Sequence, residues 1–281
     1  MSGTLYLCPT PIGNLSDISE RIIQTLKNAD LIAAEDTRNT LKLLNKFEIA
    51  VPLTSYYEHN KAQKGGLLIK KLSEGKNIAL VSDAGMPAIS DPGEDLVQLC
   101  TENGINVVAL PGPCAFATAL IASGLPTGRF SFEGFLSMNK KSRAEHLEEV
   151  KNDTRTLIFY EAPHKLLNTL KDMLEVFGER RITLARELTK KFEEYIRTTL
   201  SMAIEKYENE PPKGEFVLII EGADKNKLSE LEKESLPSCS ELLKKYIDEG
   251  ESGKPLVKKV SAELGIKSRE VYAEYLKLKN L

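Results

Sequence analysis

The sequence of 281 residues lacks any apolar run of the length that a membrane-spanning helix needs, about 18 residues. Its amino terminus, MSGTLYLCPTP, also lacks the positively charged segment followed by a long apolar core that marks a signal peptide. Hydrophobic residues make up 41% of the chain and charged residues 28%, as in water-soluble globular proteins. These features predict a cytoplasmic protein with no membrane partner.

Metal-ligating residues are scarce. Only three histidines are present, and the four cysteines form no CxxC pair, so we expect no disulfide framework, no zinc site and no other metal. The sequence also contains no GxGxxG motif after a strand, no GxxxxGK[ST], no HExxH and no GxSxG. Ordinary dinucleotide, nucleoside triphosphate, zinc protease and serine hydrolase sites therefore lack their parts.

The net charge of −3 conceals a basic carboxyl end. From Lys254 to Leu281, seven Lys and Arg residues stand against three Asp and Glu residues. This local excess is modest evidence for a nucleic-acid partner, because a charged run is usually a solvated helix face.

Short apolar segments alternate with helical patterns through the first half of the chain. Strands are expected at Thr4–Cys8, Leu31–Ala34, Ile78–Ser82 and Ile105–Leu110. This alternation predicts an α/β fold, with a mainly parallel sheet covered by helices. Around residues 124–139 the pattern breaks in a segment rich in Gly, Ser and Phe, which we interpret as the crossover into a second domain.

The predicted organisation has four parts. Residues 1–123 form an N-terminal α/β domain, and residues 124–222 form a second α/β domain. The polar stretch 223–240 is a linker, and residues 241–281 form a small C-terminal helical region. Its last two helices, separated by Gly265, resemble a helix-turn-helix.

Three loops rich in proline and glycine follow strands of the first domain, at Tyr6–Asn14, Ser82–Gly93 and Val107–Ala115. Loops at the carboxyl ends of the strands in one parallel sheet lie along the same edge. Such an edge brings a small ligand against backbone groups, so we expect a ligand site there.

Seven motifs in a fixed order extend over nearly the whole chain. They are PTPIGNL (Pro9–Leu15), AEDTR (Ala34–Arg38), SDAGMPAISDPG (Ser82–Gly93), LPGPCA (Leu110–Ala115), FYEAPHK (Phe159–Lys165), ARELTKKFEE (Ala185–Glu194) and GEFVLIIEG (Gly214–Gly222). On these motifs the chain resembles the tetrapyrrole methylase superfamily, and within it the branch that modifies ribosomal RNA. AEDTR, SDAGMP and RELTK in one order are specific to that resemblance.

The resemblance implies methylation of the ribose 2′-oxygen of a cytidine in small-subunit (16S) ribosomal RNA, by in-line transfer from S-adenosylmethionine. It further implies two α/β domains of the tetrapyrrole methylase type, with the cofactor in the cleft between them, and a homodimer. The partner that it implies is ribosomal RNA or the assembled small subunit. The implied reaction needs no metal.

The resemblance also assigns residues to the cofactor. They are Pro11, Ile12, Asp83, Ala84, Gly85, Met86, Cys114, Ala115, Tyr160, Glu161, Ala185, Arg186 and Glu187, with Glu215 and Phe216 as weaker candidates. Backbone groups and short side chains in tight loops can recognise adenine and ribose, and a carboxylate tolerates a sulfonium nearby. Asp83 is the expected polar anchor. The alternative for Asp83 is a purely loop-stabilising role.

Glu35, Asp36, Thr37 and Arg38 follow a short strand, so they are expected at the same edge of the sheet. Two acids and an arginine can hold a ribose, accept its proton and bind a neighbouring phosphate. Asp36 is the first candidate for proton acceptor or ribose orienter, followed by Glu35 and Lys190, while Thr37 and Arg38 are expected to bind substrate. The alternative is that Asp36 or Thr37 caps the next helix.

In the C-terminal region, Lys258, Lys259, Lys267 and Arg269 can contact phosphates, and Tyr272 can stack on a base or pack in the core. Two other functions stay open. One is a tetrapyrrole-type small-molecule C-methyltransferase, although the first loop reads PTPIGNL where those enzymes have GxGxGDP. The other is a non-catalytic module for RNA binding or ribosome assembly, which rests on the basic tail alone.

Overall fold

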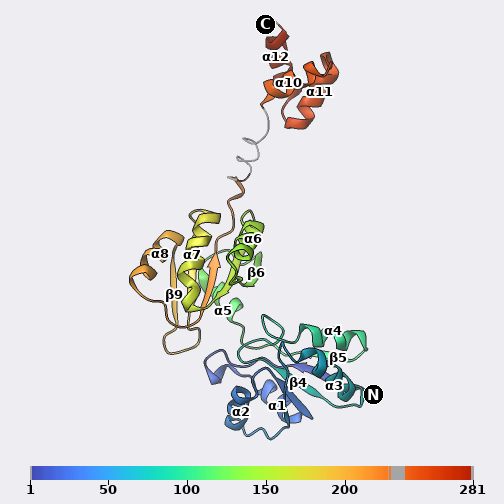
Figure 1. The fold of residues 1–281 in the computed structure, drawn as a ribbon, viewed down its shortest axis with the longest axis vertical. Coiled ribbons are helices and arrows are strands. Elements are labelled where there is room, and N and C mark those ends of the chain that lie inside the picture. Colours follow the sequence, from blue (N-terminus) through green and yellow to red (C-terminus); the bar gives the residue numbers. More distant parts are fainter. Residues whose placement is uncertain (1, 227, 229–237, 280–281) are drawn as a thin grey trace. The chain divides into compact units, whose positions relative to one another are not determined.

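The computed structural model of this chain describes residues 2–226, 228 and 238–279. The chain divides into two compact units, residues 1–222 and residues 223–281 (Figure 1). Most of the linker expected over residues 223–240 falls outside the described residues. Within the described residues, no helix combines the length and the apolar character needed to cross a membrane.

The first sheet of the larger unit is parallel throughout, with the strand order β3-β2-β4-β1-β5. Its strands are β1 Thr4–Leu7, β2 Leu31–Ala34, β3 Leu53–Ser55, β4 Ile78–Val81 and β5 Asn106–Ala109. The central strand β4 is buried along its whole length, because it is paired on both sides and covered on both faces. The parallel sheet predicted from the alternating pattern is confirmed.

Helices cover both faces of this sheet (Figure 1). Their bounds are α1 Glu20–Asn28, α2 Thr37–Lys46, α3 Lys61–Ser73 and α4 Glu94–Glu102. Buried side chains such as Ile22 and Leu44 attach α1 and α2 to one face, and Leu68 and Leu96 attach α3 and α4 to the other. Each such side chain contributes about 1.5–3 kcal/mol of burial free energy.

The second sheet is mixed, with the order β6-β7-β10-β8-β9 and β6 beside β7 as its parallel pair. Its strands are β6 Phe130–Phe135, β7 Thr156–Glu161, β8 Arg181–Arg186, β9 Glu194–Thr199 and β10 Phe216–Ile220. Strand β6 lies inside the segment 124–139 that the sequence suggested was a crossover. That interpretation missed a strand, because a bulge between Phe132 and Gly134 interrupts its alternation.

Helices also cover both faces of the second sheet. Helices α6 (Lys140–Val150), α7 (Pro163–Phe177) and α8 (Leu200–Asn209) share one core with it. Helix α5 (Ala115–Ser123) follows β5 in the chain, yet it packs on the opposite face of the second sheet. A domain boundary at residue 123 stays a prediction, and the packing of α5 groups this helix with the second sheet.

The C-terminal unit contains the helices α10 (Cys239–Asp248), α11 (Gly253–Leu264) and α12 (Ser268–Lys279). Ser238 and Glu241 form a capping box at the start of α10. Gly265, with φ of 63°, ends α11 in the left-handed conformation. Their shared core comprises Leu242, Leu243, Leu256, Val257, Val260, Val271 and Tyr275. The predicted helical region is confirmed.

Candidate functional site

The loops after β1 and β4 are hydrogen-bonded to each other at one edge of the first sheet. Thr10 N donates to the Gly85 carbonyl at 2.9 Å, and Gly85 N donates to the Thr10 carbonyl at 3.0 Å. The buried hydroxyls of Thr10 and Ser82 donate to the carbonyls of Ser82 and Gly85, at 3.1 and 2.9 Å. These hydrogen bonds pair backbone groups of the loops that have no partner strand in the sheet. They therefore hold the irregular backbone in place.

The loop after β4 contains backbone conformations that L side chains rarely adopt. Ala88 and Ser90 have φ of 66° and 59°, and Gly93 has φ of 143°. A Cβ atom on Gly93 would lie 2.7 Å from Leu80 Cδ2. Strain of this kind costs about 1–3 kcal/mol per residue and concentrates at ligand sites, where the surrounding structure enforces it.

A pocket of about 550 Å³ opens beside these loops, and we name it the acidic pocket. One wall comes from the loops after β1, β4 and β5, and the other from the ends of β7, β8 and β10. The described residues that line it include four acids, Asp83, Asp91, Glu161 and Glu215. They include no lysine or arginine. Its volume suits a small molecule, and its charge favours a cation.

Most of the residues expected to contact the cofactor lie in the wall of the acidic pocket. They are Ile12, Asp83, Ala84, Gly85, Met86, Cys114, Ala115, Tyr160, Glu161 and Ala185, together with the weaker candidates Glu215 and Phe216. Pro11 lines a second pocket instead. Arg186 and Glu187 line neither pocket. Arg186 Nε donates to the Lys213 carbonyl at 2.7 Å, and Glu187 Oε1 accepts from Lys190 Nζ at 3.0 Å.

Other residues of the wall were not predicted from the sequence. They are Ile89, Ser90, Asp91, Phe135, Ala162, Pro163, Leu188 and Val217. Asp91 lies within the SDAGMPAISDPG motif, so a signal for it was present in the sequence. Phe135 ends β6, the strand that the sequence pattern did not reveal.

Tyr160 and Glu161 organise the wall at the end of β7. Tyr160 Oη accepts from Phe116 N at 3.2 Å, which ties β7 to the start of α5. Burial raises the pKa of Tyr160, so its hydroxyl stays neutral. Glu161 is buried, and its two oxygens accept from Ala162 N at 2.9 Å and from Thr169 Oγ1 at 2.6 Å. Both side chains are therefore held rigidly.

Asp36 begins helix α2 as its N-cap, so the capping alternative is confirmed. Asp36 Oδ1 accepts from Arg38 N at 2.8 Å, and Oδ2 lies 2.8 Å from Arg38 Nη2. These hydrogen bonds from Arg38 lower the pKa of Asp36 to about 2. A carboxylate with so low a pKa accepts a proton poorly near neutral pH, so the geometry favours a positioning role. Thr37 and Arg38 form the first turn of α2.

Asp83 connects the loop after β4 to the start of α2. Its Oδ1 accepts from Asp36 N at 3.1 Å, and its Oδ2 accepts from Asn39 Nδ2 at 3.3 Å. The loop-stabilising role considered for Asp83 is thus observed, at a residue that also lines the acidic pocket.

Two further carboxyl groups at this edge have raised pKa values. Burial, with the charges of Glu35 and Asp83, raises the pKa of Asp91 to about 7. Burial and the charges of Asp83 and Asp36 also raise the pKa of Glu35, which lines neither pocket. An acceptor works best when its pKa lies near the operating pH, so Asp91 has the suitable value among the acids of the wall.

Lys190 is bound between two carboxylates. Its Nζ donates to Glu187 Oε1 at 3.0 Å and to Glu215 Oε2 at 2.7 Å. Burial by itself lowers the pKa of a lysine, but the bonds to Glu215 and Glu187 outweigh burial and raise the pKa of Lys190. Lys190 is therefore protonated near neutral pH, and the expectation that it serves as a proton acceptor is at odds with this geometry.

The basic residues of the C-terminal unit differ in their contacts. Lys258, Lys267 and Arg269 are exposed. Lys259 pairs with Glu251 at 2.6 Å and lies 3.8 Å from the centre of the Tyr246 ring. Tyr272 is 46% exposed, so the core-packing alternative for this residue is wrong.

The match to a family model covers residues 4–203, and the chain belongs to the family described as tetrapyrrole (corrin/porphyrin) methylases. It is 53% identical to the ribosomal RNA small subunit methyltransferase I of Halalkalibacterium halodurans, over 97% of this chain and 94% of that protein. It is 49% identical to the protein of that name from Bacillus subtilis, over the same shares of each chain.

Solved structures of methyltransferases share this fold. The methyltransferase CobJ has a TM-score of 0.59 at 18% identity, covering 79% of this chain and 95% of its own. A uroporphyrin-III C-methyltransferase from Thermus thermophilus, complexed with S-adenyl homocysteine, has a TM-score of 0.53 at 16% identity, covering 77% and 97%. The predicted fold class and family are confirmed.

Proposed function

We propose that this chain methylates the ribose 2′-oxygen of a cytidine in 16S ribosomal RNA, with S-adenosylmethionine as methyl donor. The observation that carries the proposal is the 53% identity, over nearly the full length, to a protein named ribosomal RNA small subunit methyltransferase I. The substrate is the RNA or the assembled small subunit, and the chain acts as a homodimer.

The acidic pocket suits this donor. When bound, S-adenosylmethionine supplies a methyl group that is already activated by a positively charged sulfur. The wall carboxyl groups of Asp83 and Glu161, which form no ion pair with a lysine or arginine among the described residues, favour such a cation, whereas Glu215 is paired with Lys190. The related structure from Thermus thermophilus is complexed with S-adenyl homocysteine, which supports a donor of the same class here.

The protein's contribution is mainly alignment, because the reacting atoms must lie within about 3–3.5 Å and in line. Asp36 holds the Arg38 guanidinium, whose side chain is 87% exposed and can reach a phosphate of the RNA. Thr37 joins Arg38 in binding the substrate. Asp91 accepts the proton of the 2′-hydroxyl, and Glu35 is the second candidate for that role.

The test is incubation of the protein with isotope-labelled S-adenosylmethionine and, separately, small-subunit RNA, assembled small subunits or tetrapyrrole precursors. Mass mapping of the RNA should locate one methylated ribose on a cytidine. Label on a tetrapyrrole would favour the small-molecule C-methyltransferase instead. If the protein retains RNA on a filter but transfers no labelled methyl group, the result would favour the non-catalytic RNA-binding module.

A further inference from the structure

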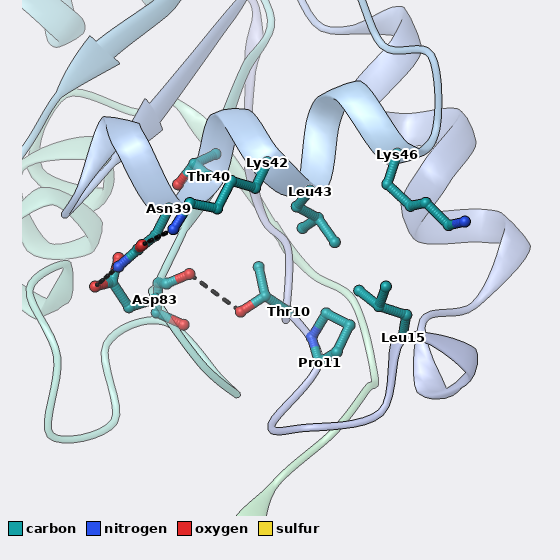
Figure 2. Close-up of a pocket in the computed structure, with 10 residues that line it drawn as sticks. Thr10, Pro11, Leu15, Asn39, Thr40, Lys42, Leu43, Lys46 and Asp83 are labelled. Atoms are coloured by element: carbon teal, nitrogen blue, oxygen red, sulfur yellow. Dashed lines mark hydrogen bonds between the residues drawn. The ribbon is translucent and has the colours of Figure 1, made fainter. Parts of the chain in front are cut away.

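A second pocket, of about 380 Å³, lies between helix α2 and the loop after β1 (Figure 2). Helix α2 lines it with Asn39, Lys42, Leu43 and Lys46, at the spacing that places side chains on one face of a helix. We name it the basic pocket, because two lysines line it. Pro11 and Leu15 are among the residues that complete its wall, and so is Asp83, which also lines the acidic pocket.

Among the residues that the structure describes, no carboxylate forms a direct ion pair with the lysines of the basic pocket. Lys42 Nζ donates to the neutral Asn39 Oδ1 at 3.3 Å, and Asn39 Nδ2 in turn donates to Asp83 Oδ2 at 3.3 Å. Across the described part of the chain, the side chain of Lys46 has no hydrogen-bond or ion-pair partner. Figure 2 shows Lys42 directed toward Asn39 and Asp83, whereas Lys46 lies at the opposite end of the pocket. Two cations without a carboxylate partner favour an anionic ligand.

Apolar surface separates the two lysines. The apolar side chain of Leu15 is 45% exposed to solvent. Leu43 and Pro11 also contribute apolar surface to the wall of the pocket. A ligand that is anionic at its ends and flat and apolar between them matches this arrangement. A nucleotide in a single strand has that character, with phosphates on both sides of a base that can lie against apolar side chains.

The two pockets have opposite charge and meet at Asp83. The proposed reaction requires such a pair, because its donor is a cation and its acceptor is a polyanion. We propose that the basic pocket holds a nucleotide of the RNA strand next to the methylated ribose, with Lys42 and Lys46 on its phosphates and Leu15 against its base. This inference rests on the proposed function for the identity of the strand.

The test compares the double variant Lys42→Ala/Lys46→Ala with Lys70→Ala/Lys71→Ala. The control lysines are exposed on α3, which packs on the opposite face of the same sheet, so both variants remove two surface charges. Binding of a fluorescein-labelled single-stranded RNA is measured by anisotropy over a range of salt concentrations. Methyl transfer to small-subunit RNA and calorimetric binding of S-adenosylmethionine are measured in parallel.

Each phosphate contact with a single strand contributes about 0.7 to the slope of log K against log salt. Loss of both contacts should therefore reduce that slope by about 1.4 and raise the KM for RNA roughly three- to tenfold. Affinity for S-adenosylmethionine should stay within about twofold, because the lysines line the other pocket.

A separate variant tests the proposed contact between Leu15 and the base. Leu15→Ala should weaken RNA binding without changing the salt slope, because an apolar contact releases no counterions. The matched control is Leu67→Ala on α3, whose side chain is 51% exposed. Equal RNA affinity in these two variants would overturn the assignment of Leu15.

The outcomes separate this inference from the proposed function. If the wild type methylates RNA and the Lys42/Lys46 variant keeps the slope and KM of its control, the basic pocket does not hold the strand. If the Lys42/Lys46 variant shows the predicted slope change in RNA binding but the wild type transfers no methyl group, the proposed function fails while the RNA site stands. If the wild type does not bind RNA, both are overturned.

Discussion

At the scale of single residues, Asp36 and Asp83 are hydrogen-bonded neighbours with different roles. Asp36→Asn keeps a side chain that can cap α2, but it removes the charge that holds Arg38. Turnover should fall roughly ten- to hundredfold through misplacement of the substrate, while affinity for S-adenosylmethionine stays within about twofold. Asp83→Asn should instead weaken that affinity about three- to tenfold. Steady-state kinetics and calorimetric titration of both variants check this, and the reverse pattern would refute the roles.

Asp91 makes stability depend on pH. Its pKa in the folded protein, about 7, lies above the ordinary value of 3.8, so folding favours the protonated form. Its contribution to stability is complete below pH 4 and is lost as the pH rises through 7. Asp91→Asn keeps a neutral side chain at every pH, so its melting temperature should exceed that of the wild type at pH 8 but not at pH 4. Calorimetric scans at both values check this, and a constant difference would contradict it.

The roles of these acids were only partly predictable from the sequence. The AEDTR motif placed two acids and an arginine at the correct edge of the sheet, and the capping alternative for Asp36 was available from residue type alone. The pKa values of these acids could not be predicted from the sequence, because they depend on burial and on charges from other loops. Asp91 was passed over for that reason, and the two carboxylates that bind Lys190 come from different segments of the chain.

At the scale of elements, the regular α/β part of the chain was predictable because each strand and helix has its own apolar period. Strand β3 has only three residues, too few for a period to show. Helices α6 and α8 carry short apolar faces between charged residues, and β6 contains a bulge. Their positions depend on tertiary packing against the second sheet, which no local pattern records.

The strained loop after β4 gives a test at this scale. Gly93→Ala should lower the free energy of unfolding by about 1–3 kcal/mol, because an added Cβ meets Leu80 and φ of 143° disfavours an L residue. Gly66→Ala is the control, since Gly66 lies within α3 and has no atom within 4 Å of an added Cβ. That change should stabilise the protein by up to about 1 kcal/mol. Denaturant titration of both variants checks the opposite signs, and equal effects would argue against strain in this loop.

At the scale of the whole molecule, the sequence indicated where a small-ligand site lies but not that two pockets of opposite charge meet there. The loops of the acidic pocket carry recognisable motifs. Lys42 and Lys46, by contrast, look like ordinary surface residues of a helix, and only the fold brings Leu15 and Asp83 beside them. The pairing of the pockets is thus a property of the tertiary structure.

The C-terminal unit should bind the RNA, because its basic side chains Lys258, Lys267 and Arg269 are exposed and can contact phosphates. Neutralising Lys258, Lys267 and Arg269 together in the full chain should weaken RNA binding and reduce its salt slope. Affinity for S-adenosylmethionine is the internal control and should not change. Anisotropy and calorimetry measure the two, and unchanged RNA binding would restrict recognition to residues 1–222.

Asp83 belongs to both pockets, and its carboxylate accepts hydrogen bonds from the first turn of α2. A ligand in either pocket therefore alters the electrostatic environment of the other. By thermodynamic linkage the coupling must be reciprocal: whatever factor the donor adds to the affinity for the strand, the strand adds to the affinity for the donor. When the methyl group is transferred, the donor's sulfur loses its positive charge. The product of the donor then favours the bound strand less than the donor did, so the methylated strand dissociates more readily and the reaction promotes release of its own product.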